Sequence, residues 1–174
     1  MSRVDFLVTH WQLCDSLKCA NGKRIQPTMK IHTSRFGNVD IQPDDILFFR
    51  GGLLGFEECQ HWVILADADN PSVAWLQSMQ SAEIALPVVS PRRFVPEYQV
   101  RLDPIDIESL HLGSVNQAYV LSIVSRDTDV LTLNLRAPII INLDRRLGCQ
   151  VITTDQQPIQ YKLTALPLPM RRIA

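Results

Sequence analysis

Alternating apolar and polar positions recur along the chain in short segments, which is typical of strands that bury one face. Leu131, Leu133 and Leu135 alternate with polar residues, and a strand predicted from Tyr119 to Ser125 precedes them across a polar turn. The segment from Ile139 to Ile141 is instead an unbroken β-branched run. This run predicts a strand that is covered on both faces, near the middle of a sheet or barrel.

Further strands are predicted where apolar segments lie between turn residues. They span Lys30 to Phe36, Val39 to Ile41, Ile46 to Phe49, Trp62 to Ala66, Ile84 to Ser90, Tyr98 to Leu102, Cys149 to Thr153 and Ile159 to Leu163. Pro87 confines its strand to an edge or a bulge, because proline donates no ladder hydrogen bond. The segment from Val73 to Gln80 is compatible with a strand end or with one helical turn, and its pattern leaves both open.

Glycine and proline mark the predicted connections. Gly37-Asn38 predicts a hairpin turn, Arg136 to Pro138 predicts a bend, and Asp144 to Gly148 predicts a polar hairpin whose glycine takes a positive φ. The best helix candidate runs from Pro104 to Leu112, with Asp103 as its cap. Short strands at spacings of roughly 8–12 residues therefore predict an all-β fold, a small antiparallel β-barrel-like domain with one or two short helical turns.

The strand pattern begins at Met29 and ends at Leu163, so we expect residues 29–163 to form one domain. We expect residues 1–28 to be an N-terminal extension that is either poorly ordered or a misassigned start, and residues 164–174 to be an extended tail. A chain of 174 residues can bury a core without disulfide staples. Its four cysteines contain no CxxC pair, which favours reduced thiols.

Charge and hydropathy narrow the class of function. The chain has 17 basic and 18 acidic residues and a net charge of −1, which does not favour non-specific nucleic-acid binding. No apolar run approaches the ~18 residues that span a bilayer, and the N-terminus lacks the apolar core of a signal peptide. We therefore expect a cytoplasmic protein that has no membrane partner.

The residues that commonly carry chemistry form no catalytic constellation. Cys59 and His61 are close enough to share a metal but have no second paired cluster. The glycine-rich segment from Arg50 to Glu58 has neither GxGxxG spacing nor a GK[ST] ending. Two aspartate pairs lie beside predicted turns, where aspartate bonds its own backbone: Asp67 with Asp69, and Asp127 with Asp129. The sequence predicts no enzyme activity, no metal and no cofactor.

Four segments, in order, resemble the FliW family of flagellar assembly factors. They are GLLGFEECQHWVIL from Gly52, WLQS from Trp75, LPVVSPRRFVPEYQV from Leu86 and NLRAPIIINLDRRLGCQVI from Asn134. The resemblance covers roughly residues 29–163. Within the first segment, Leu54 stands where proline is common in the family.

This resemblance implies a non-enzymatic cytoplasmic regulator with two protein partners, flagellin and the translational repressor CsrA. Family members bind flagellin before its secretion and also bind CsrA, and this partner switching couples the flagellin level to flagellin translation. The glycine-rich loop, if it is not simply tucked onto the core, and the closing motif supply the expected partner-binding residues. These are Leu53, Leu54, Phe56, Glu57, Glu58, Arg136, Asn142 and Gln150.

An alternative from another class is a small β-barrel that binds RNA or a small ligand directly. It would require a basic face built from two arginine doublets, Arg92 with Arg93 and Arg145 with Arg146. Doublets in loops are usually solvated surface, and no aromatic stripe accompanies these two. We therefore expect no direct contact with nucleic acid.

Overall fold

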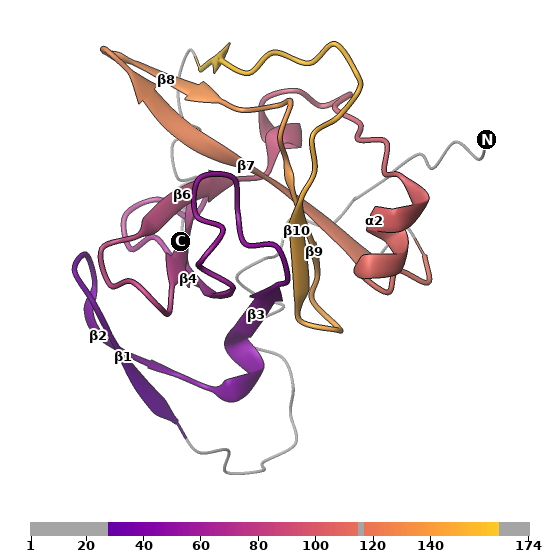
Figure 1. Cartoon of the computed structure of the whole chain (residues 1–174). Coiled ribbons are helices and arrows are strands. Elements are labelled where there is room, and N and C mark those ends of the chain that lie inside the picture. Colours follow the sequence, from indigo (N-terminus) through magenta and orange to yellow (C-terminus); the bar gives the residue numbers. More distant parts are fainter. Residues whose placement is uncertain (1–27, 115–116, 164–174) are drawn as a thin grey trace, which may run out of the picture.

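The computed structural model describes residues 28–114 and 117–163 (Figure 1). The elements of this part of the chain, in order, are β1 (Met29–Thr33), β2 (Gly37–Ile41), the 3₁₀ turn η1 (Pro43–Asp45), β3 (Ile46–Phe49), β4 (His61–Ala66), β5 (Ala74–Ser78), β6 (Ala85–Val89), the 3₁₀ turn η2 (Pro91–Arg93), α2 (Pro104–Ser109), β7 (Ala118–Asp127), β8 (Val130–Leu133), β9 (Ile139–Asn142), β10 (Leu147–Gln150) and β11 (Tyr161–Lys162).

One sheet contains all strands except the first two. Its order is β11-β8-β7-β6-β5-β4-β3-β10-β9, and an additional pairing of β7 with β9 closes it into a barrel. Neighbouring strands are antiparallel apart from β3 and β10, which run parallel. The predicted all-β barrel-like fold is confirmed, with α2 as its short helical element. The expected extension and tail lie outside the described residues, apart from Thr28.

Strand β9 lies where the barrel closes, between β10 and β7. Its isoleucines Ile139, Ile140 and Ile141 are each 0% exposed. The first and third pack in the cluster that contains Trp62, whereas the middle one packs in a second cluster that contains Tyr98. The prediction that this strand is covered on both faces is confirmed.

The segment that precedes α2 forms the outer layer over β9. The predicted strand from Tyr98 to Leu102 is wrong, because this segment has no ladder partner among the described residues. Tyr98, Val100 and Leu102 are nevertheless buried, and the residues between them are exposed. The Tyr98 hydroxyl donates a 2.6 Å hydrogen bond to the carbonyl of Leu135. The alternation therefore reflects an extended chain that lies on the barrel wall.

The predicted helix is confirmed as α2, although it ends at Ser109, before the predicted end at Leu112. Pro104 occupies its first turn, and the Asp103 N–H donates to Oδ2 of Asp106 at 3.4 Å. Among residues 28–114 and 117–163, no helix is long and apolar enough to cross a membrane.

Strand β6 pairs with both β5 and β7, so the prediction that Pro87 marks an edge or a bulge is wrong. The Ser78 N–H donates to the Ile84 carbonyl (2.9 Å), and hydrogen-bonded pairs alternate along an antiparallel ladder. Pro87 and Trp75 therefore form a non-hydrogen-bonded pair, and pairing with β7 begins only at Val88. A proline fits here because no donor is needed. The same ladder shows that the segment Val73 to Gln80 contains a strand, β5, and no helical turn.

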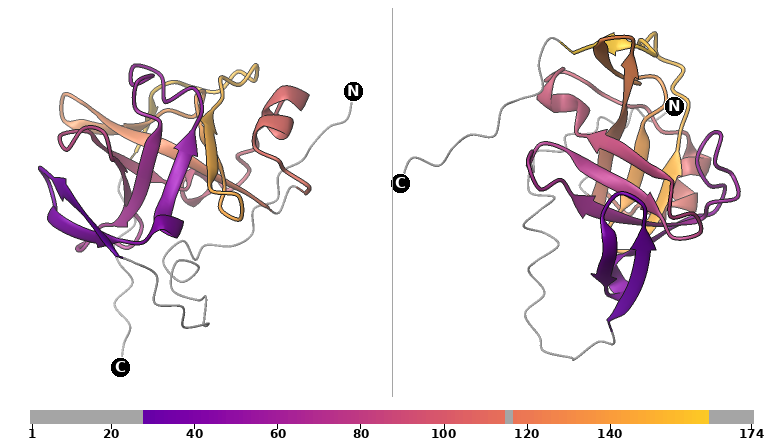
Figure 2. Two further views of the ribbon diagram at one scale, coloured as in Figure 1. Left: turned by 60° about the horizontal axis from the view of Figure 1, so that its bottom comes forward. Right: turned by 90° about the vertical axis from the view of Figure 1, so that its left-hand side faces the viewer.

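Strands β1 and β2 form the predicted hairpin as a separate two-stranded sheet that projects from the barrel (Figure 2). The turn differs from the predicted Gly37-Asn38: Thr33 pairs with Gly37, so residues 34–36 form the turn, and Gly37 begins β2 with a φ of 67°. The Ser34 N–H donates to the Ala82 carbonyl at 2.9 Å, and the Arg35 guanidinium lies 3.7 Å from the Trp75 ring centroid. These contacts fasten the tip of the hairpin to the barrel.

The β9–β10 connection differs from its prediction in the role of its glycine. The residue with positive φ in this turn is Arg146, at 57°, and Gly148 lies inside β10. A Cβ on Gly148 would stand 2.3 Å from Cζ of Phe49. Glycine is therefore required because the buried ring of Phe49 lies against the β10 backbone.

Candidate functional site

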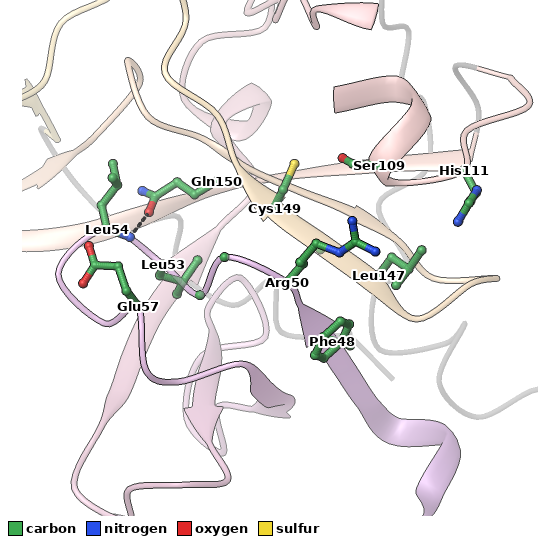
Figure 3. A pocket seen from close by; sticks show the side chains of 13 residues that line it. Phe48, Arg50, Leu53, Leu54, Glu57, Ser109, His111, Leu147, Cys149 and Gln150 are labelled. Atoms are coloured by element: carbon green, nitrogen blue, oxygen red, sulfur yellow. Dashed lines mark hydrogen bonds between the residues drawn. The ribbon is translucent and has the colours of Figure 1, made fainter. Parts of the chain in front are cut away.

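A hollow of about 390 Å³ lies between the glycine-rich loop and β10 (Figure 3). Its walls are Phe48, loop residues 50–54 and 57, β10 itself, and two residues at the end of α2, Ser109 and His111. Four of the predicted partner-binding residues line it: Leu53, Leu54, Glu57 and Gln150. Gln150 lies almost a hundred positions after the other three, and the parallel pairing of β3 with β10 brings it to them.

The loop owes its shape to two glycines. Leu53 and Phe56 face each other across a tight turn, in which the Phe56 N–H donates to the Leu53 carbonyl at 2.8 Å. Gly55, at the third position of this turn, has a φ of 82°, which favours glycine. Gly52 has a φ of 66°, and a Cβ there would lie 2.6 Å from the main chain of Glu57. No other residue fits at Gly52 without moving the loop.

Gln150 ties the loop to the barrel. Its Oε1 accepts a 2.9 Å hydrogen bond from the Leu54 N–H, and its Nε2 donates a 3.0 Å bond to the carbonyl of Ala137. Ala137 belongs to the bend that precedes β9, where Arg136 is exposed. The side chain of Gln150 thus joins two segments from which partner contacts were predicted.

Two of the predicted partner-binding residues are buried. Leu53 is 1% exposed and Asn142 is 0% exposed. Asn142 donates from Nδ2 to the carbonyl of Leu110 at 2.9 Å and accepts at Oδ1 from the Arg145 N–H at 3.3 Å. Because they are buried, these two residues position the loop, the end of α2 and the β9–β10 turn. Their expected part in partner binding stays a prediction.

The remaining predicted residues are accessible. Leu54 is 53% exposed. Glu57, Glu58 and Arg136 are also exposed, and Phe56 and Gln150 are half-buried. Whether they contact a partner stays a prediction. Sequence reasoning missed four further residues that line the hollow, Phe48, Arg50, His111 and Leu147. No local pattern distinguishes them, because they come from β3, the start of the loop, the end of α2 and β10 and meet only in the fold.

The electrostatics of the hollow suit recognition. The Gly55 N–H donates to Oε1 of Glu57 at 2.9 Å, and this bond lowers the pKa of the Glu57 carboxyl, so that it carries a charge at neutral pH. Arg50 supplies an opposite charge in the same hollow. Burial, and secondarily the nearby carboxylate of Asp106, raises the pKa of the Cys149 thiol to about 12. Cys149 is therefore protonated at neutral pH. Since a cysteine acts as a nucleophile or metal ligand only as a thiolate, Cys149 serves as a wall residue.

The arginine doublets needed by the RNA-binding alternative belong to separate elements. Arg92 and Arg93 lie on η2, where Arg92 donates from Nε to the Tyr98 carbonyl at 2.9 Å and burial lowers the pKa of Arg93. Arg145 and Arg146 lie in the β9–β10 turn, and only Arg145 is exposed. Within residues 28–114 and 117–163, no group of three or more metal-ligating side chains occurs.

The fold and this surface together define a class: a small closed β-barrel that presents a glycine-shaped loop beside a mixed apolar and charged hollow. Comparison with known proteins then specifies the family. A family model described as FliW protein matches residues 30–163.

Individual relatives agree with this match. Flagellar assembly factor FliW of Bdellovibrio bacteriovorus is 39% identical over 142 residues, covering 78% of this chain and 81% of the relative. That of Syntrophus aciditrophicus is 38% identical over 139 residues, covering 78% and 87%. A crystal structure of the flagellar assembly factor FliW aligns with a TM-score of 0.70 at 31% identity, over 78% of this chain and 95% of that chain. The chain belongs to the FliW family of flagellar assembly factors.

Proposed function

We propose that this protein binds flagellin and the translational repressor CsrA in the cytoplasm, and that exchange between these partners couples the flagellin level to flagellin translation. Membership of the FliW family over residues 30–163 is the observation that carries the proposal. The hollow fits a binding protein, since it is lined by apolar and charged side chains and its one thiol is held protonated. Enzyme activity is not part of this role.

Partner switching requires two complexes that exclude each other. Free protein would hold CsrA away from flagellin messenger RNA, and accumulating flagellin would capture the protein and release CsrA. Since each partner lowers the concentration of protein free for the other, modest differences in affinity set the switch point.

Several exposed carboxylates lie in the glycine-rich loop or precede it in the chain, which suits protein binding better than RNA binding. Asp40, Asp44, Glu57 and Glu58 are exposed in the segments that lead into the loop or form it. Carboxylates placed beside CsrA would repel RNA phosphates, so antagonism need not require occupation of the RNA site itself.

The deciding experiment is gel filtration of the purified full chain mixed separately with CsrA and with flagellin. We expect each mixture to elute earlier than its components. Leu54→Ser keeps the N–H that Gln150 binds but removes an exposed apolar side chain, and we expect it to weaken at least one complex. Ile105→Ser is the matched control, because Ile105 is 74% exposed on α2. Failure of the unaltered chain to associate with either partner would refute the proposal.

Titration of labelled flagellin leader RNA tests the direct RNA-binding alternative. We expect no saturable binding by this protein alone and a loss of RNA binding only when CsrA is present. Saturable binding in the micromolar range at physiological salt, weakened steeply by added salt, would instead favour an RNA-binding barrel.

A further inference from the structure

Strand β3 leaves its neighbour β10 early. The two strands share only two residue pairs, the second of which joins Phe49 to Gly148. The chain then turns into the glycine-rich loop, where the Gly52 N–H donates to the Phe49 carbonyl at 3.0 Å. β10 continues to Gln150 and keeps its pairing with β9 on the opposite side. Beside the end of β10, the position that β3 would have occupied is therefore not part of the ladder.

The main chain of Gln150 points toward this position. The Val151 N–H donates to the Pro138 carbonyl (3.0 Å), and the Thr153 N–H donates to the Arg136 carbonyl (2.9 Å), both on the β9 side. Main-chain groups of an extended chain alternate in direction, so the N–H and C=O of Gln150 face away from β9. Because Gln150 also lines the hollow, this short strand edge forms part of its wall.

The hollow lies beside the end of β10, where a longer β3 would have continued the ladder. Phe48, Leu53 and Leu147 give it apolar walls. Figure 3 shows Leu54 and Glu57 at one end and His111 at the other, with the Arg50 side chain between them. A ligand that follows β10 would thus meet the Glu57 carboxylate at one end and, toward α2, the Arg50 guanidinium together with the apolar side chains of Phe48 and Leu147.

We propose that this groove binds an extended peptide segment of a partner protein, which adds as a short strand beside Gln150, packs an apolar side chain against Phe48 and Leu147, and directs an acidic side chain to Arg50. Its other end carries a basic side chain toward Glu57. Strand addition supplies main-chain hydrogen bonds, and the apolar and charged walls supply selectivity. This inference rests on the proposed function only in that the ligand is a segment of a protein.

The first test uses the ¹⁵N-labelled full chain and the blocked peptide acetyl-Asp-Leu-Val-Lys-amide. We expect saturable shifts of the Gln150 and Gly51 amide signals, with a dissociation constant of roughly 0.1–1 mM, as suits four residues. The same peptide with an N-methyl group on its central amide should bind roughly 3- to 10-fold more weakly, because it loses a strand hydrogen bond. Acetyl-Asn-Leu-Val-Gln-amide should also bind more weakly. Absence of saturable shifts at these amides, or equal binding of the N-methylated peptide, would overturn the proposal.

Two variants test the groove itself. Arg50→Glu reverses the charge that faces the acidic side chain, and we expect it to abolish measurable binding of the charged peptide. Lys162→Glu, which makes the same charge change at an exposed position of β11, is the control and should bind as the unaltered chain does. Equal binding by Arg50→Glu and Lys162→Glu would overturn the proposal.

Gly51→Trp places a large side chain at the lining of the groove with little risk to the fold, because a Cβ on Gly51 meets no atom within 4 Å. We expect this variant to lose peptide binding and to weaken association with flagellin or CsrA. Unchanged association with both would overturn the groove as a partner site and leave the proposed function standing. Failure of the unaltered chain to bind either protein would refute the proposed function instead, while the peptide titration would still decide the fate of the groove.

Discussion

Gly148→Ala adds a single methyl group at the point where β10 packs against the barrel core. Its Cβ would lie 2.3 Å from Cζ and 2.5 Å from Cε2 of Phe49, distances far inside van der Waals contact. The Phe49 ring is 0% exposed and lies edge-on to Trp62, with ring centroids 6.4 Å apart. The ring therefore cannot move aside without displacing the core.

Two effects of opposite sign set the magnitude. The alanine restricts the unfolded chain, which stabilises a protein by about 0.4–1 kcal/mol where the backbone accepts it, and Gly148 is not among the glycines with positive φ. Overpacking a closed core costs about 1–3 kcal/mol. Because the clash is with the ring of a fully buried side chain, overpacking should prevail, and we expect a net loss of about 2 kcal/mol. A loss of this size would lower the melting temperature by roughly 4–8 °C for a chain of this length.

Urea denaturation of the variant and the unaltered chain measures this difference directly. Gly51→Ala is the matched control, because its Cβ meets no atom within 4 Å, and its stability should not fall. Combining Gly148→Ala with Phe49→Leu should cost less than the sum of the two separate changes, since the smaller side chain leaves room for the methyl group. If Gly148→Ala left the stability unchanged, or if the two changes were additive, the steric argument would be refuted.

Four further predictions follow from other parts of the molecule. Ile140→Ala should lower the free energy of unfolding by about 2–5 kcal/mol because it opens a cavity beneath β9, and urea denaturation showing a loss under about 0.5 kcal/mol would contradict the central place of this strand. We propose that residues 29–163 suffice for the fold, so deletion of residues 1–28 should shift the melting temperature by only a few degrees; a fall of more than about 10 °C would contradict this. The Trp75 Nε1–H donates to the Asp67 carboxylate at 2.8 Å, and this bond is the chief reason why the pKa of Asp67 lies below its ordinary value of 3.8. The ionised carboxylate therefore stabilises the fold above pH 3.8, and this stabilisation is lost as the pH falls through the folded pKa. Trp75→Phe keeps a ring beside Arg35 but should raise the pKa of Asp67, which NMR titration of its carboxyl group would detect. Finally, the raised pKa of Cys149 predicts that its thiol is alkylated much more slowly at pH 8 in the folded chain than in urea, as peptide mass analysis would show.

The sequence predicted the barrel because its strands carry local signals. The β-branched run of β9 has no exposed residue, and Asp103 with Pro104 begins a helix through contacts made within four residues. The segment from Tyr98 to Leu102 misled the prediction, since alternate burial arises on any covered wall whether or not a ladder is present. Periodicity reports which side chains are buried and does not report hydrogen-bond partners.

The candidate site was predicted only in part, for a related reason. The glycine-rich loop could be recognised from its composition. The opposite wall could not, because it comes from β10 and the end of α2, which are distant in sequence. Gly148 shows why a local rule fails here. The turn pattern predicts a glycine with positive φ, but glycine is required because of the Phe49 ring, which comes from a strand almost a hundred residues earlier. Only the register of β3 against β10 brings these parts together.

Leu54 shows how one side chain can alter the wall of the groove. It precedes Gly55 in the tight turn, at the position that proline favours because its φ is already fixed there. Proline carries no N–H, whereas the N–H of Leu54 donates to Gln150 at 2.9 Å. This chain thus gives up the rigidity of proline and gains a hydrogen bond that joins the loop to β10, where the ladder with β3 has already ended. Since Gln150 also bonds the carbonyl of Ala137, this one side chain joins the loop, β10 and the bend before β9 at one wall of the groove.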